Sequence, residues 1–169
     1  VDLLKFPAPR FHDGDGGRYI GTGDCLINAD PDSGFINAGT YRIQLHENNL
    51  LGLWMSPGQD GRLICAKYWQ QGKSCPVVVT FGQDPLLFLV AGQSMPYGLS
   101  EFDYYGGLRG APIDVICGEL TGLPIPAYAE IAIEGEFLPG QGKEEGAFSE
   151  WAGYYASGEK MEPLIKVHR

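Results

Sequence analysis

Two glutamates near the C-terminal end of the chain have a spacing that suits acid–base chemistry. Glu145 and Glu150 lie five residues apart in a segment that Gly146 interrupts and that aromatic residues flank. Two carboxylates held close together can divide the roles of acid and base if an apolar neighbour, Phe148 or Trp151, removes one of them from water. A solvated acidic loop is the alternative, and the local sequence alone favours it.

A second polar stretch is Asn37-Ala38-Gly39-Thr40-Tyr41-Arg42, in a segment with strand-like alternation. Asn37 and Arg42 would face opposite sides of a sheet, because side chains alternate along a strand, unless Gly39 permits a bulge. An arginine at a sheet edge is usually solvated. By itself, this stretch does not establish a site.

Two further stretches combine a tight turn with a carboxylate. Ser56-Pro57-Gly58-Gln59-Asp60-Gly61 resembles a turn that enters a helix, where Asp60 would cap backbone N–H groups. The glycine-containing segment from Gln93 to Glu101 would bring backbone amides close to a planar or phosphorylated ligand. The alternative for Glu101 is an ordinary surface carboxylate.

Composition excludes several classes of protein. No dinucleotide-binding GxGxxG, P-loop, HExxH or GxSxG motif is present. The net charge of −9 and the lack of a Lys/Arg cluster argue against a nucleic-acid partner. No segment approaches the roughly 20 apolar residues of a membrane helix. The four cysteines have no zinc-site spacing, and we expect them to be buried free thiols in a reducing cytoplasm.

The elements that must position these residues are mostly short strands. Glycine (25 residues) and proline (12 residues) are spread along the chain, which is typical of strands joined by tight turns. The patterns predict strands at 18–28, 35–45, 50–55, 76–81, 113–118 and 129–137 and short helices at 60–71 and 85–91. We expect one β-rich barrel or sandwich rather than βαβ units.

The remaining segments are predicted to be irregular. Residues 1–17 form an arm, and residues 18–160 form a single domain. Residues 96–111 are expected to be a loop or a strand kinked by glycines, and 139–150 a loop. Residues 161–169 are expected to be a polar tail.

Taken together and in order, these stretches resemble the central domain of UbiD-type decarboxylases, relatives of 3-polyprenyl-4-hydroxybenzoate decarboxylase. The runs that carry the resemblance include NAGTYR, GLWMSPGQDGR, FGQDPLLFL, MPYGLSEFDYYGGLRG, GLPIPAYAEIAIEGEF and EEGAFSEWAGYY. The resemblance implies an α+β, β-dominated split barrel, like that of flavin reductases, with a few short helices. The N- and C-terminal domains of the full-length family are not present in this sequence.

The resemblance also implies a reaction, the reversible, non-oxidative decarboxylation of an aromatic or α,β-unsaturated acid through a covalent bond to prenylated FMN. Arg42, Glu145 and Glu150 match the family's catalytic positions. Glu150 would be the general acid, Arg42 would hold the substrate carboxylate, and Glu145 would position Arg42.

Cofactor contacts are implied in the same way. The residues expected at prenylated FMN are Asn37, Gly39, Thr40, Tyr41, Arg42, Gln59, Gly92, Gln93, Ser94 and Glu101. Asn37, Asp60 and Glu101 match the positions of ligands to Mn²⁺ or Mg²⁺, with K⁺ nearby. Asp60 stands where the family has histidine, and an aspartate is an acceptable hard ligand for these ions.

Other functions remain open on the sequence. A small carboxylic acid is the expected substrate, and we expect a homo-oligomer or association with the family's other domains. One alternative is a non-catalytic flavin-binding or assembly domain of a split or truncated decarboxylase. Another is an unrelated all-β interaction domain.

Overall fold

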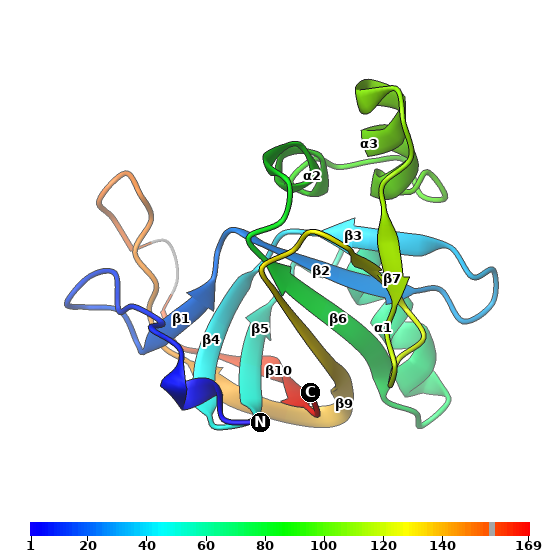
Figure 1. The fold of residues 1–169 in the computed structure, drawn as a ribbon. Helices are drawn as coiled ribbons and strands as arrows, with labels where there is room; N and C mark the ends of the chain where they lie inside the picture. The colour runs from blue at the N-terminus through cyan, green and yellow to red at the C-terminus, as the bar shows by residue number, and fades with distance from the viewer. Residues whose placement is uncertain (156–157) are drawn as a thin grey trace.

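Short apolar strands build one curled antiparallel sheet in the computed structural model, which describes residues 1–155 and 158–169 (Figure 1). Its strands follow the order β1-β4-β5-β10-β9-β6-β2-β3. They are β1 (Arg18–Gly21), β2 (Asp24–Ala29), β3 (Ile36–Gly39), β4 (Arg42–Glu47), β5 (Leu50–Trp54), β6 (Cys75–Phe81), β9 (Ile131–Glu145) and β10 (Lys160–Val167).

The other elements lie outside this sheet. The ribbon of β7 (Val115–Cys117) and β8 (Pro124–Pro126) is a separate pair of strands. The helices are α1 (Asp60–Gln70), α2 (Pro85–Ala91) and α3 (Glu101–Arg109), with a 3₁₀ turn at Leu3–Lys5. Figure 1 shows α2 and α3 together on the side of the sheet where β2 and β3 lie.

Chain connectivity forces the sheet to curl. β3 and β4 are eighth and second in the strand order, which would separate them by about 29 Å in a flat sheet with a strand spacing of about 4.8 Å. Yet only Thr40 and Tyr41 connect them, and three Cα–Cα steps span at most about 11 Å. The two ends of the sheet therefore meet. Residues 35–45, predicted to be one strand, are two strands that belong to opposite ends of the sheet.

The same argument applies to the connection between β1 and β2, which are first and seventh in the order. We call the two connections, residues 21–24 and 39–42, the seam of the barrel. The predicted β-dominated split barrel with a few short helices is thereby confirmed.

Two apolar cores hold the barrel on its two sides. Leu26 of β2 and Val77 and Val79 of β6 point into the barrel, in the cluster that α1 joins through Ile64. Their neighbours in sequence, including Ile27, point outward into a second cluster beneath α2 and α3. Central strands buried on both faces explain why these segments are continuous apolar runs rather than alternating ones.

Two helix predictions are confirmed. α1 ends at Gly72, whose φ of 69° is the left-handed conformation that glycine adopts easily. α2 begins after Asp84, whose carboxylate accepts the Leu86 amide at 2.8 Å, with Pro85 in the first turn.

The prediction of a loop or kinked strand at 96–111 is wrong for residues 101–109. They form α3, which Ser100 caps by accepting the Phe102 amide at 3.3 Å and which Gly110 ends at φ 74°. Gly106 and Gly107 lower the helix propensity of the segment and hid its pattern. Glu101 is consequently the first residue of a helix.

The predictions of a loop at 139–150 and a tail at 161–169 are wrong for residues 139–145 and 161–167, for a single reason. β9 continues to Glu145 because β10 pairs with it, with Lys160 opposite Glu145 and Val167 opposite Gly135. β10 lies inside the sheet, between β9 and β5. Residues 139–145 and 160–167 show no clear strand pattern in the sequence, so the pairing between β9 and β10 stabilises both segments as strands.

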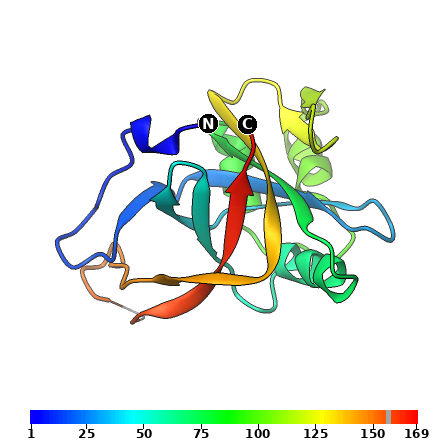
Figure 2. The same cartoon turned by 90° about the horizontal axis from the view of Figure 1, so that it is seen from below.

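The arm at residues 1–17 follows the outside of the barrel, as Figure 2 shows from below, where both termini lie close together. Leu3 donates its amide to Asn48 O, and Val167 donates to Asn49 O, so both termini meet the β4–β5 turn. Cys25, Cys65 and Cys75 are buried free thiols, whereas Cys117 is exposed, contrary to prediction. Among the described residues, no helix is long and apolar enough to cross a bilayer.

Candidate active site

A cavity of about 330 Å³ opens along the seam of the barrel. It lies where the two ends of the sheet meet, so its wall combines residues from both connections and from the end of α2. The lining residues are Thr22, Gly39, Thr40, Tyr41, Arg42, Trp54, Ser56, Gln59, Ala91, Gly92, Gln93, Ser94, Phe148 and Glu150.

Arg42 lines the cavity, and Glu145 pairs with it from behind the cavity wall. Arg42, at the start of β4, donates from Nε and one terminal nitrogen to the two carboxylate oxygens of Glu145, both at 2.7 Å. The pair joins residues 103 positions apart in the chain. Only 13% of the Arg42 side chain and 4% of the Glu145 side chain are exposed. Charges this far from water are stable only when paired, and bidentate geometry fixes the guanidinium plane.

Two aromatic rings complete the setting of Arg42. Its guanidinium carbon lies 4.8 Å from the centre of the Phe148 ring and 5.2 Å from that of Trp54, the residue opposite Arg42 in the β4–β5 ladder. Burial opposes the charged form, but the bonds from Glu145 outweigh this effect and raise the pKa of Arg42. Glu150 lines the same cavity. The structure thus brings together Arg42, Glu145 and Glu150, as predicted.

The acidic segment is folded inward through Phe148 and not through Trp151. Phe148 also packs edge-to-face on Tyr19, with ring centres 4.6 Å apart, whereas Trp151 is 95% exposed. Of the two aromatic neighbours considered for Glu150, only Phe148 borders the cavity.

A buried carboxyl group ties the seam together. Asp24, fully buried at the start of β2, accepts the Tyr41 amide at 3.3 Å, and its backbone carbonyl accepts the Thr40 hydroxyl at 3.0 Å. Its Oδ2 has no hydrogen-bond partner among the described residues. Burial raises the pKa of Asp24 to about 8, so the carboxyl is protonated at neutral pH. Asp24 thus fixes the backbone that carries Arg42 without adding charge.

The opposite end of the cavity collects the other predicted residues. Asn37 is buried on β3, and its amide nitrogen donates to Asn28 Oδ1 at 3.1 Å. Asn28 in turn donates to the carbonyl of Gly61, in the first turn of α1. Glu101 Oε2 accepts the Ala38 amide at 2.9 Å. These bonds draw β3 and the first turns of α1 and α3 together.

Asp60 and Glu101 are carboxyl groups whose pKa values are both raised. Burial raises the pKa of Glu101, and the negative charge of Asp60 raises it further. Burial also raises the pKa of Asp60. Neither carboxylate takes part in an ion pair within residues 1–155 and 158–169. The structure therefore brings Asn37, Asp60 and Glu101 together beside the cavity.

This donor set fits a hard divalent cation. Two carboxylates and an amide offer oxygen donors of the kind that Mg²⁺ and Mn²⁺ take. In the part of the chain that the structure describes, no group of three or more His, Cys, Asp or Glu side chains could hold a metal by itself.

Sequence reasoning missed several lining residues, namely Thr22, Trp54, Ser56, Ala91 and Phe148 as a wall. Trp54 and Ser56 sit at the end of an apolar strand before a proline, a position that had marked only a turn. Predicted residues off the cavity wall are Asn37, Asp60, Glu101 and Glu145, which act on it through their bonds to lining residues or lie beside it.

Comparison with known proteins assigns the whole chain. Residues 1–169 match the family model described as UbiD, the 3-octaprenyl-4-hydroxybenzoate carboxy-lyase Rift-related domain. The chain is 37% identical to a phenolic acid decarboxylase of Streptomyces sp. (strain D7), covering 100% of this chain and 36% of that protein. It is 35% identical to the pyrrole-2-carboxylic acid decarboxylase of Pseudomonas aeruginosa, covering 99% and 34% respectively.

A solved structure is similar over the same range. An evolved dimeric form of the UbiD-class enzyme HmfF from Pelotomaculum thermopropionicum, in complex with prFMN, has a TM-score of 0.93 and 32% identity. The match covers 99% of this chain and 39% of that one. The chain therefore spans about a third of the length of the curated relatives it matches.

Proposed function

Because the chain belongs to the UbiD family of carboxy-lyases, we propose that it is the cofactor-binding domain of an enzyme that reversibly decarboxylates an aromatic or α,β-unsaturated acid. The observation that carries this proposal is the buried, bidentate bonding of Glu145 to Arg42, a residue that lines the same cavity as Glu150. The two relatives act on different acids by name, a phenolic acid and pyrrole-2-carboxylic acid. The substrate therefore stays at the level of a class.

Prenylated FMN fits the seam cavity as the proposed cofactor. Gly39 to Arg42, Gln59 and Gly92 to Ser94 line this cavity, and glycines let backbone approach a planar ring. When bound, the group would be linked covalently to the substrate and would supply an electron sink for the electron pair that CO₂ leaves on the substrate. Asn37, Asp60 and Glu101 would hold Mn²⁺ or Mg²⁺, with K⁺ nearby.

The protein's own residues would bind the acid and move the proton. Arg42 presents its guanidinium to the cavity between two rings and would bind the substrate carboxylate. Glu145 holds that guanidinium in one plane. Glu150, on the cavity wall, would donate a proton to the carbon that loses CO₂, and would accept one in the reverse direction.

A second candidate is a flavin-binding or assembly domain without catalytic activity. Asp60 favours it, because this position resembles a metal-ligand histidine of the family and an altered ligand would change cofactor affinity. The intact Arg42–Glu145–Glu150 set favours the enzyme. In either case we propose a cytoplasmic oligomer, in keeping with the three buried free thiols.

The test is Glu150→Gln in the whole protein, reconstituted with prenylated FMN and Mn²⁺. Removing a general acid should lower kcat by about 10³-fold, while the flavin absorbance and the melting temperature stay unchanged. Glu144→Gln is the matched control, since Glu144 is an exposed carboxylate near the end of β9 that does not line the cavity. Full turnover in Glu150→Gln would reject the assignment of the acid. Flavin binding without turnover in the unmodified protein would favour the second candidate.

A further inference from the structure

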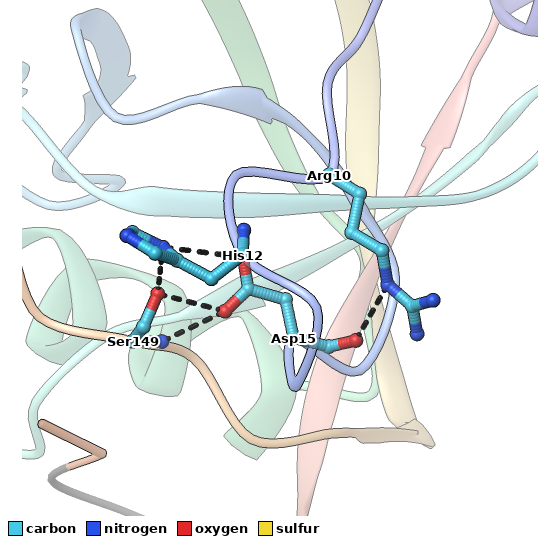
Figure 3. A network of polar contacts seen from close by, with 4 residues as sticks. All are labelled: Arg10, His12, Asp15 and Ser149. Atoms are coloured by element: carbon cyan, nitrogen blue, oxygen red, sulfur yellow. Dashed lines mark hydrogen bonds and ion pairs between the residues drawn. The ribbon is translucent and has the colours of Figure 1, made fainter. Parts of the chain in front are cut away.

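A buried polar cluster joins the N-terminal arm to the segment that carries the acidic residues (Figure 3). At its centre is Asp15, only 1% exposed. Its Oδ1 accepts both the amide and the hydroxyl of Ser149 at 2.9 Å, and its Oδ2 accepts the His12 amide at 2.9 Å. Asp15 and Ser149 are 134 residues apart in the chain. We call Asp15, His12 and Ser149 the arm cluster.

The backbones of the two segments also meet directly. The Gly16 amide donates to the Ala147 carbonyl at 2.7 Å. Gly16 and Gly146 approach so closely that a Cβ on either would overlap the backbone of the other. The Arg10 side chain donates to the Asp15 carbonyl at 2.8 Å and braces the turn of the arm. The contact is therefore close and specific, and both partners need glycine there.

The segment held in this way carries two walls of the cavity. Phe148 and Glu150, which flank Ser149 in the sequence, both line the cavity. Ser149 forms an isolated antiparallel β-bridge with Tyr155, so its backbone is extended. In an extended backbone, adjacent side chains point to opposite sides. Anchoring Ser149 to Asp15 on one side therefore directs Phe148 and Glu150 to the cavity on the other.

The charge of Asp15 is built into the cluster. Burial alone would raise the pKa of Asp15, but the bonds from Ser149 and from the His12 amide together keep it below its usual value. An ionised acceptor makes each of these bonds stronger than a neutral one would.

The three residue types also occur in hydrolytic triads, but the arrangement here differs. In a hydrolase the histidine lies between serine and aspartate. Here Asp15 bonds Ser149 directly, and His12 Nδ1 contacts the same hydroxyl from another side. With its hydroxyl buried and shared by two partners, Ser149 is anchored and not poised to attack a substrate.

We propose that Asp15, acting through Ser149, is a positioning residue that places Glu150 for proton transfer and Phe148 beneath Arg42. The N-terminal arm is thereby part of the active site, although no residue of residues 1–17 lines the cavity. This inference rests on the proposed function. It goes beyond it by making the rate of proton delivery depend on a segment outside the barrel sheet.

Two variants of the whole protein, loaded with prenylated FMN and Mn²⁺, test the proposal. Asp15→Asn keeps the shape of the side chain but places an NH₂ group against one of the groups that donate to Asp15, the His12 amide or the amide and hydroxyl of Ser149. Ser149→Ala removes only the hydroxyl. Each should lower kcat by about 10- to 100-fold, because a shift of about 1 Å at a catalytic group has an effect of this size. KM should change less than about 3-fold, since Arg42 keeps its own bonds to Glu145. Asp13→Asn, an exposed carboxylate in the same turn, is the matched control.

A readout independent of turnover is amide hydrogen exchange, which should accelerate at residues 146–150 in both variants and not in the control. If Asp15→Asn does not fold, Ser149→Ala alone tests the proposal, because this variant keeps the hydrogen bond from the backbone amide of residue 149 to Asp15. Unchanged kcat and unchanged exchange, together with an inactive Glu150→Gln, would overturn this inference alone. An active Glu150→Gln would instead overturn the proposed function.

Discussion

Acidic groups are paired with a cation at one end of the cavity and lack such a partner among the described residues at the other. At the arginine end, Glu145 is bonded on both oxygens by Arg42, and the pair is wedged between aromatic rings. At the carboxylate end, burial raises the pKa of both Asp60 and Glu101, the negative charge of Asp60 raises the pKa of Glu101 further, and a backbone amide donates to Glu101. Both ends adjoin the connection between β3 and β4, with Arg42 after it and Ala38 before it, yet only the arginine end pairs its carboxylate with a cationic side chain.

This contrast separates what is preorganised from what awaits a ligand. The arginine end is complete before anything binds, because paired charges hold each other in place. The carboxylate end carries an electrostatic strain that a cation would relieve. We therefore expect changes at the arginine end to alter catalysis, and changes at the carboxylate end to alter cofactor and metal binding.

The largest effect should come from Arg42→Lys, which breaks the bidentate pair but keeps the charge. Lysine binds as a point charge and cannot fix a carboxylate plane. We expect kcat/KM to fall by about 10²-fold or more, with flavin absorbance retained, in steady-state assays of the loaded enzyme. Arg62→Lys is the control, because Arg62 lies over Trp69, away from the cavity. If Arg42→Lys instead loses flavin but keeps normal turnover per bound flavin, then the arginine end serves cofactor binding as the carboxylate end does, and the contrast between them is wrong.

A smaller effect, of opposite kind, is expected for Glu101→Gln. The amide retains an acceptor for the Ala38 amide but removes the repulsion with Asp60. The metal-free protein should melt at the same or a higher temperature, whereas Mn²⁺ should bind about 10-fold more weakly or worse, since affinity follows ligand charge. Calorimetric titration and thermal melts measure both. A lower melting temperature without metal would mean that the carboxylate pair is not strained.

Asp60→His sharpens the comparison further, because it tests the residue that we propose as the third metal ligand. Imidazole suits Zn²⁺ and Ni²⁺ better than Mg²⁺, whereas a carboxylate suits Mg²⁺ and Mn²⁺. We expect the ratio of Zn²⁺ to Mg²⁺ affinity to rise by about 10-fold, measured by competition titration. An unchanged ratio would place Asp60 outside the metal shell.

The smallest effect is expected at Asp24, on the seam between the two ends. Its pKa is about 8 in the folded protein and near 3.8 when unfolded. The unfolded state therefore loses this proton first as pH rises, so the stability that Asp24 contributes is present below about pH 4 and is lost progressively up to about pH 8. Asp24→Asn should thus raise the melting temperature, and should raise it by several °C more at pH 8 than at pH 5. The same difference at both pH values would contradict a protonated Asp24.

Local chemistry accounts for the parts of the fold that the sequence alone predicted. Asp84 followed by Pro85 marked the start of α2, and Gly72 marked the end of α1. Each signal acts within a few residues, so it is readable without knowing the rest of the chain. The residue types at 42, 145 and 150 were also visible, and their resemblance to a family joined them.

Only the tertiary structure showed which segments that lie far apart in the sequence contact each other. The β9–β10 pairing turned an expected loop and an expected tail into adjoining strands. The bonds of Arg42 to Glu145 and of Asp15 to Ser149 join residues 103 and 134 positions apart. The energy of such contacts comes from bringing separate segments together, and a curled sheet brings together segments that no local period or turn signal connects.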